Sequence, residues 1–252
     1  MIIYKSDREI AKLAEAGQIA ARVLQAICRL AAPGVTTKDL EAEAVRLMDE
    51  HGVVSAFKGY RGYPGSICAS VNEEVVHGIP GPRKLVEGDV VSLDVGIRHD
   101  GFIGDTAWTV PVGEVDEVKR RLLETGQRCL EAAIAEVDPR RRLGDVSHAV
   151  QATAEAAGFS VVRAFVGHGV GREMHEDPQV RNYGRPGSGP PLGRGMVFAI
   201  EPMVNAGGEE VRVLDDEWTA VTADGQPSVH FEHTVAVTRD GHEVLTACPK
   251  TM

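Results

Sequence analysis

The chain has 252 residues, of which 43% are hydrophobic and 25% charged, values typical of a globular protein large enough to bury a full core. Its formal net charge is −10, and no block of Lys or Arg is present, which argues against a nucleic-acid or anionic-membrane surface. The four cysteines lack CxxC spacing and no apolar run of about 18 residues occurs, so we expect no disulfides, no zinc knot, no membrane span and a cytoplasmic location.

The first segment of the chain predicts two helices. Ser6 opens a capping box with the glutamate three residues later. Apolar side chains then recur at spacings of three and four, which is the pattern of one face of a long helix, until Pro33 ends it. A second helix follows, capped by Thr36 or Thr37, and ends at Gly52.

A β-hairpin is expected next, because the strand-like runs VVSLDVGI and FIGDTAWTV are joined by His-Asp-Gly. The hairpin brings Asp94 and Asp105 close together. A bulge at Gly101 or Gly104 is expected to aim both side chains inward. Asp94 stands within an apolar run and should be buried, whereas Asp100, at the turn, should be an exposed polar residue.

The order of helices and strand then repeats. A helix is expected around residues 116–136 and another from about Asp145 to Ala157. Pro139 and Gly158 end these helices, and each follows the residue that ends the corresponding earlier helix by 106 positions (33 to 139, 52 to 158).

The strand repeats with nearly the same offset. Residues 87–94 overlay residues 194–201 at a shift of 107. A repeat of this length is too long for a solenoid unit and indicates a duplicated half-domain. We therefore expect one domain over residues 1–252, with halves at about 3–112 and 113–247 related by a pseudo-twofold axis.

Four acidic residues and one histidine form the strongest functional signal. Asp94 and Asp105 come from the first half, Glu201 and Glu232 from the second, and His168 lies between the pairs in the sequence. Buried carboxylates this close together would repel and take up protons unless cations neutralised them. Two divalent ions supply the four positive charges, which predicts a metallohydrolase. Oxygen ligands with one imidazole suit Mn, Fe(II) or Co, and zinc remains an alternative.

Two further histidines and a group of aromatics lie around these acids in the sequence. His77 and His175 are each as consistent with a structural role as with donation to a carbonyl oxygen or a leaving amine. The apolar side chains ahead of His77 fit either a small pocket or a loop anchored on the core; they are Phe57, Tyr60, Tyr63 and Cys68. The GxGxxG and GxSxG motifs are absent, so a nucleotide loop and a serine hydrolase are not supported.

Six segments in order give the chain a family resemblance over about residues 3–247. They are YRGYPGSICASVNEEVVHGIP, EGDVVSLDVG, DGFIGDTAWTV, GHGVGREMHEDPQV, GMVFAIEPM and FEHTVAVT. Together they closely resemble the type I methionine aminopeptidases. The resemblance implies the α+β pita-bread fold, in which two pseudo-twofold halves each pack two helices on a mostly antiparallel, curved sheet. It also implies removal of the initiator methionine from nascent polypeptides with a small second residue, by attack of a dimetal-bound water or hydroxide.

Roles for individual residues follow from the resemblance. It implies that Asp105 and Glu232 bridge two ions, that Asp94 holds one ion, and that His168 with Glu201 holds the other. Glu201 would also accept the proton of the attacking water. The resemblance places His77 near the leaving nitrogen and His175 at the scissile carbonyl oxygen. The methionine pocket would be lined by Phe57, Tyr60, Tyr63, Cys68, His77, Met174, His175 and Trp218.

Further expectations concern partners and rival functions. Asn72 and Ser228 resemble a peripheral site for a monovalent cation. The expected partner is the N-terminus of a peptide or nascent chain, with transient ribosome proximity, no direct nucleic-acid contact and a monomeric state. The alternatives are a peptidase of the Xaa-Pro type on the same fold, which usually carries an extra N-terminal domain, and a catalytically silent binding scaffold, which typically loses metal ligands.

Overall fold

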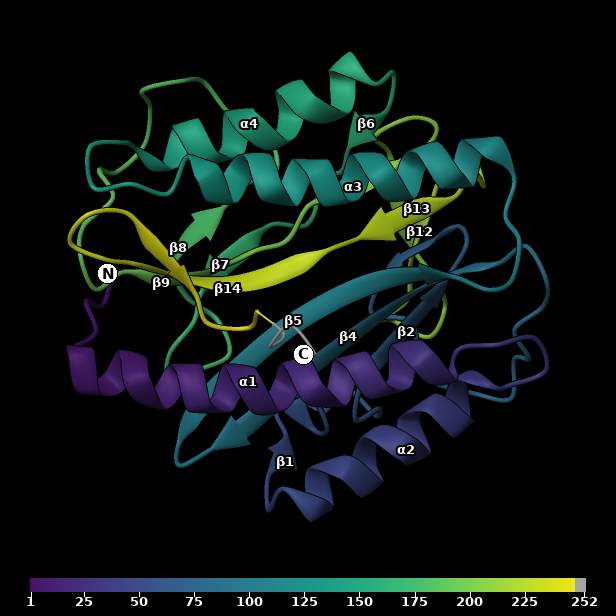
Figure 1. Ribbon diagram of the computed structural model, residues 1–252. Helices are drawn as coiled ribbons and strands as arrows, with labels where there is room; N and C mark the ends of the chain where they lie inside the picture. Colours follow the sequence, from purple (N-terminus) through teal and green to yellow (C-terminus); the bar gives the residue numbers. More distant parts are fainter. Residues whose placement is uncertain (248–252) are drawn as a thin grey trace.

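In residues 1–247, which the computed structural model describes, four α-helices lie on one face of a nine-stranded antiparallel sheet (Figure 1). The helices are α1 (Asp7–Leu30), α2 (Thr37–Glu50), α3 (Glu117–Ala135) and α4 (Leu143–Ala156), with a 3₁₀ turn η1 (Tyr60–Gly62). The strands of the first half are β1 (Val54–Ser55), β2 (Cys68–Val71), β3 (Glu74–Val76), β4 (Val90–His99) and β5 (Phe102–Pro111). Those of the second half are β6 (Ser160–Val161), β7 (Gly167–Gly169), β8 (Glu176–Val180), β9 (Val197–Ile200), β10 (Met203–Asn205), β11 (Val211–Val213), β12 (Ala220–Thr222), β13 (Ser228–His230), β14 (Glu232–Val237) and β15 (His242–Val244).

The sheet joins the two halves of the chain through its central strands. Its order is β1-β4-β5-β14-β9-β7-β8, with β2 also paired to β4 and β15 to β14. Two three-stranded sheets, β13-β10-β6 and β11-β12-β3, complete the fold. This arrangement confirms the predicted α+β class and the pita-bread fold. None of the helices in residues 1–247 combines the length and the hydrophobicity that a membrane span requires. Cys248, one of the four cysteines, lies outside the described residues.

The predicted helix caps are confirmed for the first two helices. The Ser6 hydroxyl accepts a hydrogen bond from the Glu9 amide, and the Glu9 carboxylate accepts one from the Ser6 amide at 3.1 Å. Thr36, rather than Thr37, caps α2 through the same reciprocal contacts with Asp39. Each pair satisfies backbone donors that the first helical turn would otherwise leave unpaired.

Helix α4 begins earlier than predicted. The helix is expected from about Asp145 but begins at Leu143, because the Asp145 carboxylate accepts from the backbone amide of Arg142 at 2.8 Å and so stands in the first turn. Asp39 has the same place in α2, 106 positions earlier. Both helices also have 14 residues. These matches support the predicted duplication.

Two of the core clusters in residues 1–247 largely follow the halves, whereas two others combine residues of both halves. One core cluster consists of residues between 16 and 112, and a second consists of Val90 with residues between 122 and 237. Gly88 and Gly195, 107 positions apart, both adopt the left-handed conformation at φ 89 and 91. The division into halves at 3–112 and 113–247 stays a prediction.

The central hairpin forms as predicted, except for its bulge. Strands β4 and β5 pair without interruption from Val90 with Pro111 to His99 with Phe102. Asp100 and Gly101 both have positive φ, at 48 and 79, which is typical of a two-residue type I′ turn.

The expected bulge at Gly101 or Gly104 is wrong, because the regular ladder already places the two acids on one face. Asp94 pairs with Ala107, and Ala107 lies two residues from Asp105 on the same strand. Side chains two residues apart on a strand share a face, so the acids are diagonal neighbours.

Two close helix contacts show which face of the sheet is left for these acids. A Cβ atom at Gly104 would lie 2.4 Å from the carbonyl oxygen of Ala16 in α1, so the helix crosses β5 where only glycine fits. A Cβ at Gly126 of α3 would lie 2.6 Å from the Phe231 ring. Because successive strand residues point to opposite faces, the residues after Gly104 and Phe231 point away from the helices.

The contact at Gly104 generates a stability prediction. Gly104→Ala should lower the free energy of unfolding by ~1–3 kcal/mol, because the backbone of α1 must shift to admit a methyl group. Urea denaturation measures this change. Gly81→Ala is the control, since its Cβ would lie 3.8 Å from the nearest atom. Equal unfolding midpoints for the two variants would contradict the close approach of α1 to β5.

Candidate active site

Strand pairing places three acidic side chains and a cysteine on the sheet face opposite the helices. Cys68 of β2 pairs with Asp94 of β4, Asp94 with Ala107 of β5, and Ala107 with Glu232 of β14. Paired residues share a face, so these side chains form one row across four strands. Asp105 lies on the same face, one step along β5.

The fourth acid enters this row just beyond the end of a strand. The last pair of β9 with β14 is Ile200 with His233. The next residue along β9, Glu201, therefore lies beside Glu232. Two acids from each half of the chain thus meet at the centre of the sheet, as the sequence predicts.

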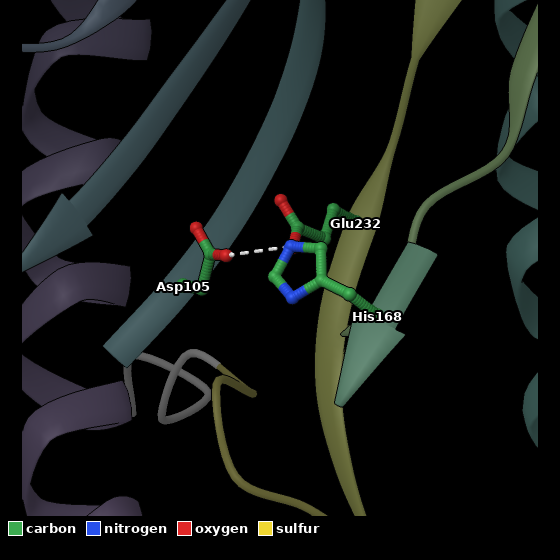
Figure 2. Close-up of side chains that lie close together, drawn as sticks. All are labelled: Asp105, His168 and Glu232. Carbon is green, nitrogen blue, oxygen red and sulfur yellow. Dashed lines mark ion pairs between the residues drawn. The ribbon is translucent and has the colours of Figure 1, made fainter. Parts of the chain in front are cut away.

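The imidazole of His168 completes the group from strand β7. Its Nε2 atom lies 3.6 Å from Asp105 Oδ2 and 3.5 Å from Glu201 Oε1. Figure 2 shows Asp105, His168 and Glu232 on three different strands, with their side chains directed toward one another. Ligand atoms of these three residues all lie within 4.8 Å of one another. The pairing of β7 with β8 shifts register between His168 and Gly169, so the irregularity near the site is here rather than in the central hairpin.

Burial and mutual repulsion make these four carboxyl groups retain protons to higher pH than usual. Burial raises the pKa of Asp94 to about 7. It also raises the pKa of Asp105, Glu201 and Glu232 well above the usual range, and the neighbouring carboxylates raise them further. Asp105 and Glu232 are each 2% exposed. Within residues 1–247, the basic side chains within 4 Å of these acids are imidazoles alone, and they contact Asp105 and Glu201.

The imidazoles cannot neutralise the acids at neutral pH. Burial lowers the pKa of His168 to about 3, with a smaller contribution from His175. His230, whose Nε2 lies 3.8 Å from Glu201 Oε2, also has its pKa lowered to about 3 by burial. Both rings are therefore neutral near pH 7, and the positive charge must come from another source.

The oxygen atoms of this group fit divalent cations. Asp94 Oδ1, Asp105 Oδ1 and Glu232 Oε1 are buried and have no hydrogen-bond partner in the described part of the chain. A buried oxygen without a donor is costly, and a bound cation removes that cost. Four carboxylates and one imidazole match the oxygen-rich coordination that suits Mn, Fe(II) or Co. The role of each side chain as a ligand stays a prediction.

A cavity of about 130 Å³ adjoins the acids. It brings together every residue that the sequence analysis placed in a substrate pocket: Phe57, Tyr60, Tyr63, Cys68, His77, Met174, His175 and Trp218. Tyr63 meets Trp218 edge to face, with centroids 5.1 Å apart. His77 has a positive φ of 61 and meets Phe165 edge to face at 5.4 Å.

Sequence reasoning missed four residues here. Val76, Phe165 and Val166 also line the cavity, and His230 lies against Glu201. The alternation in HFEH gave a signal for His230, because a residue two positions before Glu232 shares its face in an extended chain. No motif marked the three apolar residues, since such side chains occur throughout the core.

Asn72 and Ser228 are brought together, as predicted. The Ser228 amide donates to the Asn72 backbone carbonyl at 2.9 Å. The Asn72 side chain is already engaged, because its amide donates to Asp89 and its oxygen accepts from the Val90 amide. A monovalent cation at this position stays a prediction.

Comparison with known proteins gives one consistent result. The sequence profile of metallopeptidase family M24 matches residues 11–239. Methionine aminopeptidase 1 of Bacillus subtilis is 49% identical over 98% of this chain and 99% of its own length. The crystal structure of methionine aminopeptidase from Thermotoga maritima superposes with a TM-score of 0.96 at 49% identity, covering 98% of this chain and 99% of that one.

More distant structures share the fold. The prolidase of Pyrococcus furiosus has a TM-score of 0.79 and 22% identity, and the match covers 98% of this chain but 66% of the prolidase. At this identity the likeness concerns the fold alone.

The raised carboxyl pKa values predict how the metal-free protein responds to pH. Unfolded carboxyl groups titrate near pH 4, so above that pH the folded state holds more protons than the unfolded state. Above about pH 7.5 the buried histidines are mostly neutral in both states, and the carboxyl contribution dominates. The unfolding free energy should therefore fall as pH rises from about 7.5 to about 8.5.

Thermal unfolding of chelator-treated protein across this pH range measures the effect. Asp105→Asn removes one of the carboxyl groups that hold a proton, so its melting temperature should fall less steeply. Saturating Mn²⁺ should raise the melting temperature and remove the downward trend, because bound cations keep the carboxylates ionised in the folded state. A melting temperature that does not change with pH in the chelator-treated wild-type protein would contradict the raised pKa values of these acids.

Proposed function

The chain belongs to metallopeptidase family M24, and we propose that it is a methionine aminopeptidase that removes the initiator methionine from new polypeptides with a small second residue. The enzyme is a metal-dependent hydrolase. Close similarity over nearly the full length of named methionine aminopeptidases supports this function. The single observation that carries it is the position of the four acids and His168 beside a small cavity lined by aromatic and apolar side chains.

The cavity supports a methionine side chain as the group that is bound. Its apolar end combines aromatic rings with Cys68 and Met174, both of which are buried. The methionine thioether is unbranched and polarizable, and makes favourable contacts with aromatic rings. A pocket of this kind binds the first residue, and the adjoining acids would lie at the peptide bond that follows it.

We assign the steps of the reaction to residues around this junction. Divalent ions bound at the acids would polarise the scissile carbonyl and lower the pKa of a water molecule toward neutrality. Glu201 accepts the proton of the attacking water, a role worth ~10²–10⁴ in rate for a positioned base. His175 donates a hydrogen bond to the carbonyl oxygen as negative charge develops there.

His77 is assigned to the leaving nitrogen. Burial lowers its pKa to about 4, with a smaller contribution from His175, so the ring is neutral near pH 7. A neutral imidazole carries one N–H donor and one acceptor, and can hold the new amine through either. Its positive φ and its edge-to-face contact with Phe165 fix its place at the cavity wall.

Finer features of the reaction are also proposals. We propose two ions at the site, with Mn, Fe(II) or Co favoured by the ligand types and zinc as the alternative. The substrate is a peptide or nascent-chain N-terminus, met in the cytoplasm where new chains are made, with transient ribosome proximity. A monomer is sufficient, because one chain supplies every residue assigned above.

Hydrolysis rates for three peptides test the function directly. Met-Ala-Ser should be hydrolysed, Met-Lys should be hydrolysed poorly, and Ala-Pro should not be a substrate. Chelator should abolish the activity, and Mn²⁺ or Co²⁺ should restore it. Preference for Ala-Pro would instead support the Xaa-Pro peptidases that share the fold. No turnover with any of the metals would support a silent scaffold.

Two substitutions in the central hairpin test the assignment of the acids. Asp105→Asn should lower kcat by ~10³-fold or more and weaken Mn²⁺ binding, because it removes a charged ligand from a site that depends on charge. Asp100→Asn, at the exposed turn of the same hairpin, is the matched control and should leave both unchanged. Peptide hydrolysis and calorimetric Mn²⁺ titration provide the measurements, with circular dichroism to check the fold. Full activity of Asp105→Asn would remove this residue from the ligand set.

A further inference from the structure

Tyr60 holds His175 through two contacts at the mouth of the cavity. The two rings are stacked, with centroids 5.4 Å apart and planes 19° from parallel. The Tyr60 hydroxyl also lies 2.9 Å from Nδ1 of His175. The stacking restricts the tilt of the His175 ring, and the hydrogen bond restricts its rotation.

The turn that carries Tyr60 has an unusual backbone. Gly59, Arg61 and Gly62 all have positive φ, at 80, 49 and 93. This conformation is ordinary for glycine but strained for arginine, and such strain persists where the surrounding structure demands it. Arg61 places its guanidinium over the Tyr60 ring, 5.3 Å from the centroid.

We propose that Tyr60 is a positioning residue, whose hydroxyl donates to Nδ1 of His175 and thereby fixes the tautomer that carries its proton on Nε2. The inference rests on the proposed function, in which His175 contacts the scissile carbonyl oxygen. Nε2 of His175 can donate to that oxygen only if Nε2 carries the proton of the ring.

The direction of the hydrogen bond follows from the two groups that form it. A phenol is a good donor and a weak acceptor, whereas the unprotonated nitrogen of imidazole is a good acceptor. Among residues 1–247 the Tyr60 hydroxyl has no other hydrogen-bond acceptor, so donation to Nδ1 is the arrangement that uses its proton. The positive charge of Arg61 on the Tyr60 ring favours the same direction, because it makes the phenol a stronger donor.

The other ring nitrogen is then available to the substrate. Within the described part of the chain Nε2 of His175 makes no hydrogen bond, and the ring lines the cavity beside the acids. With the proton on Nε2, the ring stabilises negative charge on the carbonyl oxygen. With the proton on Nδ1, a lone pair would face that oxygen and repel it.

Tyr63 provides a matched contrast in the same segment. Its hydroxyl donates to two backbone carbonyls, those of Ile67 and Gly78, each at 3.0 Å. Its hydrogen bonds therefore hold the chain rather than an imidazole. Tyr63→Phe removes the same atom from the same pocket but leaves the contact to His175 in place.

The tautomer can be measured without reference to activity. In Zn²⁺-loaded, ¹⁵N-histidine-labelled enzyme, NMR distinguishes a protonated from an unprotonated ring nitrogen, and loss of signals in His175→Asn assigns the resonances. Wild-type enzyme should carry the proton on Nε2 of His175. Tyr60→Phe should show a mixture of tautomers, and Tyr63→Phe should keep the wild-type state.

Kinetics supply the second measurement. Tyr60→Phe should lower kcat for Met-Ala-Ser by ~10-fold or more, with KM within about threefold, because the lost interaction matters most as the oxyanion forms. A proton on Nδ1 in the wild-type enzyme would overturn the role of Tyr60 alone, as would an unchanged kcat and tautomer in Tyr60→Phe. A wild-type enzyme that fails to hydrolyse Met-Ala-Ser would remove the proposed function and, with it, this role.

Discussion

Repulsion among four carboxylates, two buried and two half-buried, is the constraint on which the rest of the structure depends. Asp94, Asp105, Glu201 and Glu232 lie on one sheet face, and the basic side chains close to them in residues 1–247 are neutral histidines, which contact Asp105 and Glu201. Left alone, such a group binds protons, as the raised pKa values indicate. Divalent ions held by these residues would polarise a carbonyl and activate water. The same negative charge therefore explains both why the acids repel one another and why they would bind divalent ions.

The fold meets this constraint by keeping the helices on the opposite face. Gly104 lets α1 approach β5 closely, and Gly126 lets α3 approach Phe231. The residues that follow in the strands, Asp105 and Glu232, consequently point into the site. In each half of the chain, a close contact between a helix and a strand therefore determines that the next residue along the strand, an acid, faces away from the helices.

Much of this was readable from the sequence, because the strongest signals were local. The capping box at Ser6, the Asp-Gly turn and the acids within apolar runs each depend on a few neighbouring residues. The failures depended on longer-range geometry. The bulge was unnecessary because the ladder register already aligns the acids. Contacts between distant segments, such as that of Tyr60 with His175, cannot be predicted from local sequence patterns. The resemblance to methionine aminopeptidases nevertheless placed both residues in one pocket.

Proton release on metal binding tests the central claim most directly. If the metal-free acids hold protons because they repel one another, divalent ions must displace those protons. Calorimetric titration of Mn²⁺ into chelator-treated protein at about pH 7, in two buffers of different ionisation enthalpy, counts the protons released. The account predicts tight binding with at least one proton released per site. Binding without proton release, or no binding, would contradict it.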